Sequence, residues 1–213
     1  MAPGTDTDVQ ELVAAECLAL ADLLSGLPPE AWDAPSLCAG WRVREVVAHL
    51  TMPARYTTAR FIAELARARG SFHRMADRSA RRDGALPADE LIGVLRGTRL
   101  PAWKPPGGGH EGALVHVVVH GLDVTTPLGL ERRVPQDRLR IVLAGLSTPR
   151  SLRYFGADLR GVELRADDIG WSLGSGTPLA GDAQDLALLL SGRRLPPGRL
   201  RGQPGHRFTG LPA

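Results

Sequence analysis

Apolar residues recur at helical spacing through the first two thirds of the chain, and polar stretches rich in proline and glycine separate these runs. The first run predicts a helix over residues 6–26, which Asp6 or Thr7 would cap and Gly26 would end. Similar runs predict four more helices, over residues 41–69, 88–99, 111–126 and 135–146. Because Pro53 lies inside the second run, we expect a kink or a break there.

Two stretches interrupt this periodicity. Residues 71–86 are rich in arginine and bracketed by glycines, and we expect them to form a loop. Residues 101–112 are rich in proline and glycine, which deny a helix its hydrogen-bond donors and its stiffness, so they should separate two helices.

The pattern changes after Ser147. Two short extended stretches with turn signals lie within residues 161–176, and residues 182–194 contain one short amphipathic helix. We therefore expect a mainly α-helical protein, with a helical bundle over residues 1–149 followed by a small α+β domain over residues 150–213.

The composition is ordinary for a soluble globular protein, with 43% hydrophobic and 23% charged residues. One of the 26 basic residues is a lysine, Lys104, and this preference for arginine suggests a genome rich in G and C. The only basic cluster spans residues 67–82 and contains a single aromatic residue, Phe72. We expect a solvated, mobile connection there, with anion binding as the alternative, and no nucleic-acid partner.

The two cysteines, Cys17 and Cys38, form no CxxC pair, which fits a reducing cytosol. The N-terminal stretch MAPGTDTDVQ is polar and acidic, unlike a signal peptide, and no apolar run approaches the length that crosses a bilayer. We expect a cytoplasmic protein without a membrane partner, either a monomer or a homodimer.

The candidate chemistry lies in three histidines. His116 and His120 are four residues apart, so a helix places them on one face, and a strand with its period of two would do the same. His49 lies in a separate helical segment. If it faces the pair across a bundle, the three imidazoles would hold a divalent metal, with zinc as the default, and leave an open position for chemistry.

Two other interpretations compete with this one. A buried histidine is often a hydrogen-bonded core residue, although burying two imidazoles on one face carries a desolvation cost that needs compensation. The spacing alone leaves metal ligation and core packing both open. The HxxxH spacing also occurs in zinc peptidases, but these need a glutamate directly after the first histidine, and Val117 occupies that place.

Several nearby residues have alternative roles. Asp123 would orient a ligand histidine through its second ring nitrogen, or it would cap the chain before Thr125. A thiolate ligand at Cys38 is conceivable, but we favour a small buried side chain. We expect the other three histidines, His73, His110 and His206, to be exposed to solvent. We expect Trp41 and Trp171 to pack in the core or between domains.

The segment PSLCAGWRVREVVAHL, followed later by VHGLDVTTPLG, resembles the DinB-like metal-binding four-helix bundle and, within it, the mycothiol-dependent maleylpyruvate isomerase family. LRADDIGWSLGSG and GDAQDLALLLSGRR resemble that family's C-terminal domain, so the resemblance covers nearly the whole chain. It implies that His49 is the first metal ligand and His120 the last, whereas His116 stands where the isomerase is expected to carry a glutamate. It also implies an essential C-terminal arginine, for which Arg193 and Arg194 are the candidates.

The resemblance further implies mycothiol, a thiol of actinobacteria, as cosubstrate. A divalent metal lowers the pKa of a thiol, and the activated sulfur adds to an electrophile. Addition, rotation and elimination would make the protein an isomerase, and release of the adduct would make it an S-transferase. The expected substrate is a small electrophile or carboxylate, the latter bound by arginine. The alternative is a non-catalytic metal- or ligand-binding module of the same fold.

Overall fold

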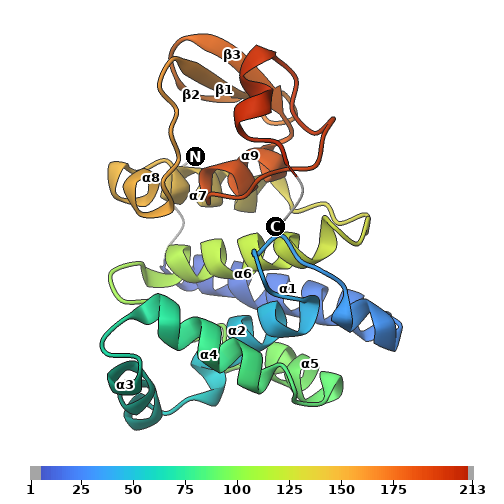
Figure 1. Cartoon of the computed structure of the whole chain (residues 1–213), viewed down its shortest axis with the longest axis vertical. Coiled ribbons are helices and arrows are strands. Elements are labelled where there is room, and N and C mark those ends of the chain that lie inside the picture. Colours follow the sequence, from blue (N-terminus) through green and yellow to red (C-terminus); the bar gives the residue numbers. More distant parts are fainter. Residues whose placement is uncertain (1–5, 211–213) are drawn as a thin grey trace.

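The computed structural model describes residues 6–210, so the first five residues of the polar N-terminal stretch lie outside the described residues. The described part forms nine α-helices and a small three-stranded sheet. In Figure 1 the helices α1–α6 form the lower part of the molecule, and α7–α9 with the sheet form the upper part. The expectation of a mainly α-helical chain with a small α+β region at its end is confirmed.

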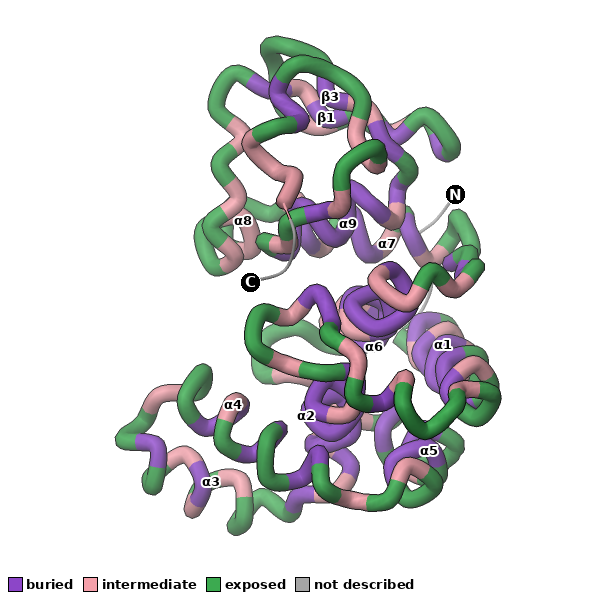
Figure 2. The backbone as a smooth tube through the Cα atoms, turned by 45° about the vertical axis from the view of Figure 1, so that its right-hand side comes forward, coloured by how far each residue is buried: buried purple, intermediate pink, exposed green. Residues whose placement is uncertain are grey.

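Four helices form a bundle in which α1 packs on α5 and α6, and α2 packs on the same two helices from the other side. Their bounds are α1 Asp6–Ser25, α2 Val43–Arg55, α5 Ala88–Arg96 and α6 Gly109–Thr125. Leucines that are almost fully buried fill the space between them, among them Leu20, Leu50, Leu91 and Leu114. Figure 2 shows the buried faces of these helices turned toward one another. Periodicity predicted three of the four helices nearly to their ends.

The helix predicted over residues 41–69 is two helices, α2 and α3 (Thr58–Arg67). The break expected from Pro53 is confirmed, because α2 ends two residues later and Tyr56 is extended, with φ −96° and ψ 135°. Thr57 then caps α3 by accepting a hydrogen bond from the backbone nitrogen of Arg60.

The loop expected over residues 71–86 is wrong, because α4 spans Phe72–Asp83. Ser71 caps this helix by accepting a hydrogen bond from the backbone nitrogen of Arg74. Arginine has a high helix propensity. A segment rich in arginine can therefore form a helix without a wide apolar stripe when carboxylates pair with its guanidinium groups.

The basic cluster of residues 67–82 finds those partners in buried carboxylates. Nη2 of Arg78 and Nη1 of Arg82 each lie 2.8 Å from a carboxylate oxygen of Glu64, and Nε of Arg82 lies 2.8 Å from Asp83. The two contacts with Glu64 join α4 to α3. The cluster is therefore an ion-paired surface of two helices rather than a solvated connection.

One boundary near the second half of the bundle also differs from expectation. The glycine-rich stretch that we expected to stop a helix forms the first turn of α6 from Gly109 onward. The glycines that precede it, Gly107 and Gly108, still separate α6 from α5 as predicted.

The C-terminal region continues from α7, which packs on α6 and on α9. Its elements are α7 Gln136–Leu146, α8 Pro149–Phe155, β1 Val162–Ala166, β2 Trp171–Gly174, β3 Thr177–Gly181 and α9 Ala183–Leu190. The strand order is β2-β1-β3, with β1 antiparallel to β2 and parallel to β3. The two extended stretches and the short helix are confirmed, while α8 and β3 were not predicted. A domain boundary between residues 149 and 150 stays a prediction.

None of the helices in residues 6–210 combines the length and the apolar character that a membrane crossing requires.

Asp185 is a buried carboxyl of α9. Burial, only partly offset by Arg199 with its Nη1 at 3.4 Å, raises the pKa of Asp185 from 3.8 to about 6. Ionisation of Asp185 therefore opposes folding. A difference of one pKa unit between the folded and unfolded states corresponds to about 1.4 kcal/mol, so the cost above pH 6 is on the order of 2–3 kcal/mol. Because the folded pKa is the higher one, this cost appears as the pH rises from the unfolded pKa to the folded one.

Asp185→Asn should thus raise the free energy of unfolding near pH 7.5 by about 2 kcal/mol and near pH 4 by well under about 1 kcal/mol. Urea unfolding of both proteins at the two pH values measures this. An equal effect at both pH values would show that the carboxyl is not held protonated by burial.

Candidate metal centre

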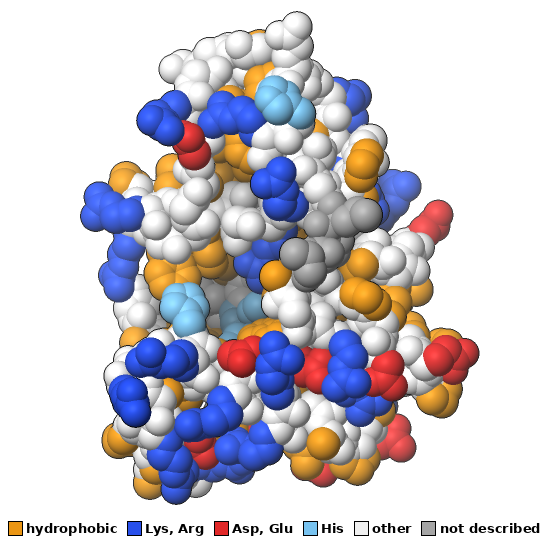
Figure 3. Space-filling model, viewed as in Figure 1, with side chains coloured by type: hydrophobic (Ala, Val, Ile, Leu, Met, Phe, Trp, Pro, Cys, Tyr) orange, Lys and Arg blue, Asp and Glu red, His pale blue; other side chains and the backbone are white. Residues whose placement is uncertain are grey.

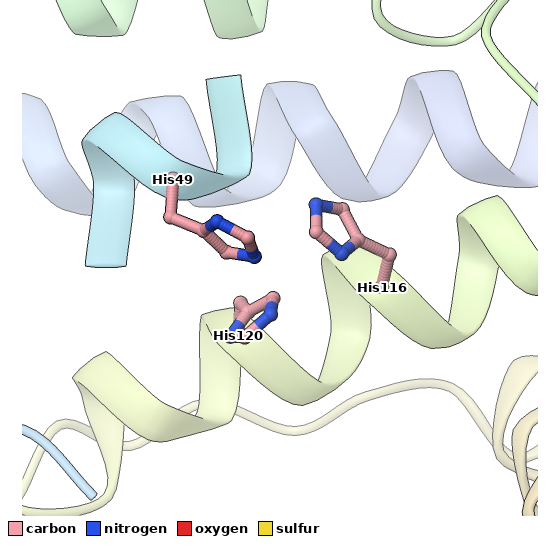
Figure 4. A group of neighbouring side chains, drawn as sticks. All are labelled: His49, His116 and His120. Carbon is pink, nitrogen blue, oxygen red and sulfur yellow. The ribbon is translucent and has the colours of Figure 1, made fainter. Parts of the chain in front are cut away.

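The structure brings the three histidines together. His49 extends from α2, and His116 and His120 extend from one face of α6. The ring centroids are 5.4 Å apart for His49 and His116, 5.0 Å for His49 and His120, and 4.8 Å for His116 and His120. One nitrogen from each ring can be chosen so that all three lie within 4.8 Å of one another. Figure 4 shows the rings converging on one space between the two helices.

Two of the ring nitrogens at this centre lack partners. Nδ1 of His49 and Nε2 of His116 are buried, and neither has a hydrogen-bond partner within residues 6–210. Figure 4 shows the other nitrogen of each of these two rings directed toward the shared space, and it is the convergence of those nitrogens that fits a divalent cation.

The electrostatics keep two of these imidazoles neutral. Burial lowers the pKa of His49 from 6.5 to about 3, and His120 and Arg193 add to the shift. Burial, with His120 and His49 beside it, also lowers the pKa of His116 well below 6.5. Since a histidine binds a metal through a neutral ring nitrogen, both are in the ligating form at neutral pH.

Asp123 fixes the third imidazole. It is fully buried, and its Oδ2 accepts a hydrogen bond from Nδ1 of His120 at 2.9 Å. With the proton on Nδ1, the lone pair of His120 is on Nε2. The carboxylate faces His120 and not the end of α6, where the Thr125 hydroxyl donates to the Gly121 carbonyl instead.

Arg193 holds the same carboxylate from the C-terminal region. Its Nε donates to Oδ1 of Asp123 at 2.9 Å, its Nη2 donates to Oδ2 at 2.7 Å, and its Nη1 donates to the carbonyl of Ser191 at 2.6 Å. Burial alone would raise the pKa of Asp123, but Arg193 and His120 hold it well below its usual range. The charge of Arg193 is thus compensated, and most of its donors are in use.

Cys38 completes this cluster and is half-buried, whereas we expected a small buried side chain. Its thiol donates to Oδ2 of Asp123 at 3.0 Å, and Nη2 of Arg193 lies 3.4 Å from the sulfur. Burial and the Asp123 carboxylate raise the pKa of this thiol. Cys38, His120 and Asp123 also lie close enough to form a metal site, but the guanidinium of Arg193 already provides the cation there.

A cavity of about 710 Å³ opens beside the three imidazoles. Its walls come from α2 and the loop before it, from α4, α6 and α8, and from the residues after α9, and they include Trp41, Arg193 and Arg194. Figure 3 shows histidine and hydrophobic side chains gathered at this hollow. Arg194 is exposed at the cavity and donates from Nε and Nη2 to the Thr209 carbonyl at 3.2 and 2.9 Å.

The remaining histidines follow the expectation in two of three cases. His73 and His206 are exposed, but His110 is buried at the start of α6, with Nδ1 2.9 Å from the carbonyl of Asp6. The tryptophans Trp41 and Trp171 are partly buried and pack against the core. Trp41 also lies over His49, with ring centroids 5.1 Å apart, which the sequence did not indicate.

Comparisons with known proteins identify the family and the fold. The family model described as the mycothiol maleylpyruvate isomerase N-terminal domain matches residues 13–125. A crystal structure of the mycothiol-dependent maleylpyruvate isomerase superposes with a TM-score of 0.63 at 16% sequence identity, covering 95% of this chain and 94% of that one. A histidine-to-alanine mutant of that enzyme gives a TM-score of 0.62 at 14% identity over the same shares. These likenesses establish a shared fold across nearly the whole chain, and no curated protein sequence matches it.

The geometry of this centre predicts the stability of the metal-free protein. Asp123→Asn removes the negative charge that compensates Arg193 in a buried place and should lower the free energy of unfolding by about 3 kcal/mol. The matched control is Asp22→Asn, which breaks an exposed ion pair with Arg96 and should cost less than about 1 kcal/mol. Urea unfolding in the presence of a chelator measures both. Equal, small losses would contradict the role of Asp123 as the buried counter-charge.

Proposed function

Because residues 13–125 match its model, the chain belongs to the mycothiol maleylpyruvate isomerase N-terminal domain family, and we propose that it is a metal-dependent enzyme with mycothiol as its thiol cosubstrate. The observation that carries the proposal is the cluster of three imidazoles, in which one nitrogen of each ring lies within 4.8 Å of the others, at the wall of a cavity of about 710 Å³. Such a cluster matches a catalytic metal site with three protein ligands and one open position.

His49, His116 and His120 would hold the divalent cation, and zinc suits three neutral imidazoles. When bound, the cation lowers the pKa of a thiol and so supplies a nucleophilic sulfur at neutral pH. Three neutral ligands would not offset the charge of the cation, so its full charge would act on the pKa of the thiol. A glutamate in place of His116 would offset part of that charge, so His116 favours a strongly acidified thiol.

The other residues of the centre would position these groups. Asp123 keeps the proton of His120 on Nδ1, and Arg193 keeps Asp123 ionised and aimed at that ring. Cys38 holds its own proton toward Asp123, so it does not compete with an incoming thiol for the cation. Arg194 has donors at the cavity and would bind a carboxylate of the substrate.

Two reactions are compatible with a thiol nucleophile in this cavity. In an isomerisation, sulfur adds to one carbon of a conjugated cis double bond, the new single bond rotates, and loss of sulfur restores the double bond as trans. In an S-transfer, the adduct takes up a proton at the neighbouring carbon and is released. The proposal covers both reactions, because a substrate held by Arg194 and a thiol held at the proposed metal site would be positioned in the same way for each.

Metal content tests the proposal directly. Protein purified without chelators should contain about one divalent ion per chain, and mycothiol-dependent turnover should vanish on chelation and return with zinc. His49→Ala and His120→Ala should each lose the ion, because two imidazoles alone bind it weakly. His206→Ala removes an exposed histidine of the C-terminal region and should leave metal content and turnover unchanged.

Wild-type protein that neither contains nor takes up a divalent ion would overturn this proposal. Protein that binds the ion at these histidines but turns over no thiol with any electrophile would support a non-catalytic module of the same fold.

A further inference from the structure

The outer wall of the cavity is aromatic. Phe72 and His73 of α4 line one part of it, and Tyr154 and Phe155 of α8 line another. The rings of His73 and Tyr154 stack across the two helices with centroids 6.0 Å apart and an interplanar angle of 22°. Tyr154 and Phe155 meet edge to face at 4.9 Å. The cavity is thus lined by these rings as well as by the three histidines of the proposed metal site.

Two of these rings are unusually exposed. Among the described residues, four large hydrophobic side chains are exposed, and two of them, Phe72 at 42% and Tyr154 at 60%, line this one cavity. Apolar surface in water is costly, and a cluster of it at a cavity is typical of a ligand-binding wall. The other two, Leu18 and Ile62, lie outside the cavity lining.

Apart from the cation that the three histidines would hold, and which the thiolate would neutralise in part, the cavity has little free cationic character. Arg193 is compensated by Asp123, as described above. Asp77 also lines the cavity, and its Oδ1 accepts hydrogen bonds from Nε1 of Trp41 at 2.9 Å and Nε of Arg81 at 3.0 Å. Arg194 remains, with Nη1 free of hydrogen bonds to residues 6–210. The cavity therefore suits a ligand with one anionic group.

We propose that the electrophile of this site is an aryl-substituted conjugated acid with a single carboxylate, whose ring packs on Phe72 and Tyr154 and whose carboxylate pairs with Arg194. This inference rests on the proposed thiol chemistry and names the substrate class for it. A compact aliphatic dicarboxylate would leave the aromatic wall in water, and its second carboxylate would find no second free guanidinium. Planar rings pack well on aromatic side chains, and a carboxylate matches a guanidinium.

The reaction of such a substrate balances without a further reagent. The thiol sulfur forms a bond to one alkene carbon, and the π electron pair moves toward the conjugated carbonyl. The proton that the thiol releases ends on the neighbouring carbon in S-transfer. In isomerisation the carbon–sulfur bond breaks again after rotation, and the electron pair returns to the double bond.

A pair of probes isolates the contribution of the ring. cis-3-Benzoylacrylate and cis-3-acetylacrylate share the conjugated double bond, the ketone and the single carboxylate, and differ by a phenyl in place of a methyl group. The rates are measured with zinc-loaded protein and mycothiol and corrected for the uncatalysed reaction. We expect kcat/KM for the benzoyl compound to be about tenfold higher than kcat/KM for the acetyl compound.

Variants then assign that preference to residues. Phe72→Leu and Tyr154→Leu keep an apolar side chain but remove the ring, and each should reduce the preference to about threefold or less. Ile62→Leu is the matched control at an exposed hydrophobic position outside the cavity and should leave it unchanged. Arg194→Gln should lower kcat/KM for both probes by a similar factor, about tenfold, because both carry the carboxylate.

Binding of unreactive analogues separates this inference from the proposed function. Calorimetry of the zinc-loaded protein should show 3-benzoylpropanoate binding more tightly than 4-oxopentanoate, and Tyr154→Leu should remove the difference. Equal binding of the two analogues, or equal kcat/KM for the two probes, would overturn the aryl preference while leaving the thiol enzyme intact. Tight binding of the aryl analogue without turnover of either probe would instead contradict the proposed function and keep the aryl site.

Discussion

The carboxylate of Asp123 joins three parts of the chain that are far apart in sequence. It accepts hydrogen bonds from His120 on the bundle helix α6, from Arg193 after α9 and from the thiol of Cys38 before α2. A fully buried carboxylate cannot remain ionised without such partners, so the three contacts depend on one another. The orientation of His120 therefore depends on how the C-terminal region packs against the bundle.

The sequence predicted those features of the fold that apolar periodicity and short-range residue spacing determine. It predicted the bundle helices α1, α5 and α6, the break after Pro53, and the shared face of His116 and His120. It missed α4, because the arginines of that helix are stabilised by carboxylates such as Glu64 that lie on another element. It also missed the contacts of Asp123 with Cys38 and Arg193, because these span 85 and 70 residues.

The charge distribution around the imidazoles suits an external nucleophile better than an activated water. Asp123, which contacts His120, is paired with Arg193, and Asp77, which lines the cavity, accepts hydrogen bonds from Trp41 and Arg81. Neither is placed as the general base that a zinc hydrolase needs, which agrees with the valine at position 117. The neutral charge of the proposed ligand set and the aromatic wall instead fit a thiol that meets an organic electrophile.

X-ray absorption at the metal edge of the zinc-loaded protein measures which atoms surround the ion. We expect three imidazole nitrogens at about 2.0–2.1 Å from it, from His49, His116 and His120, and no sulfur neighbour before any thiol is added. A sulfur shell at about 2.3 Å in the protein alone would show that Cys38 is a ligand and that the guanidinium of Arg193 does not provide the cation beside Asp123. Fewer than three imidazoles would contradict the proposed centre itself.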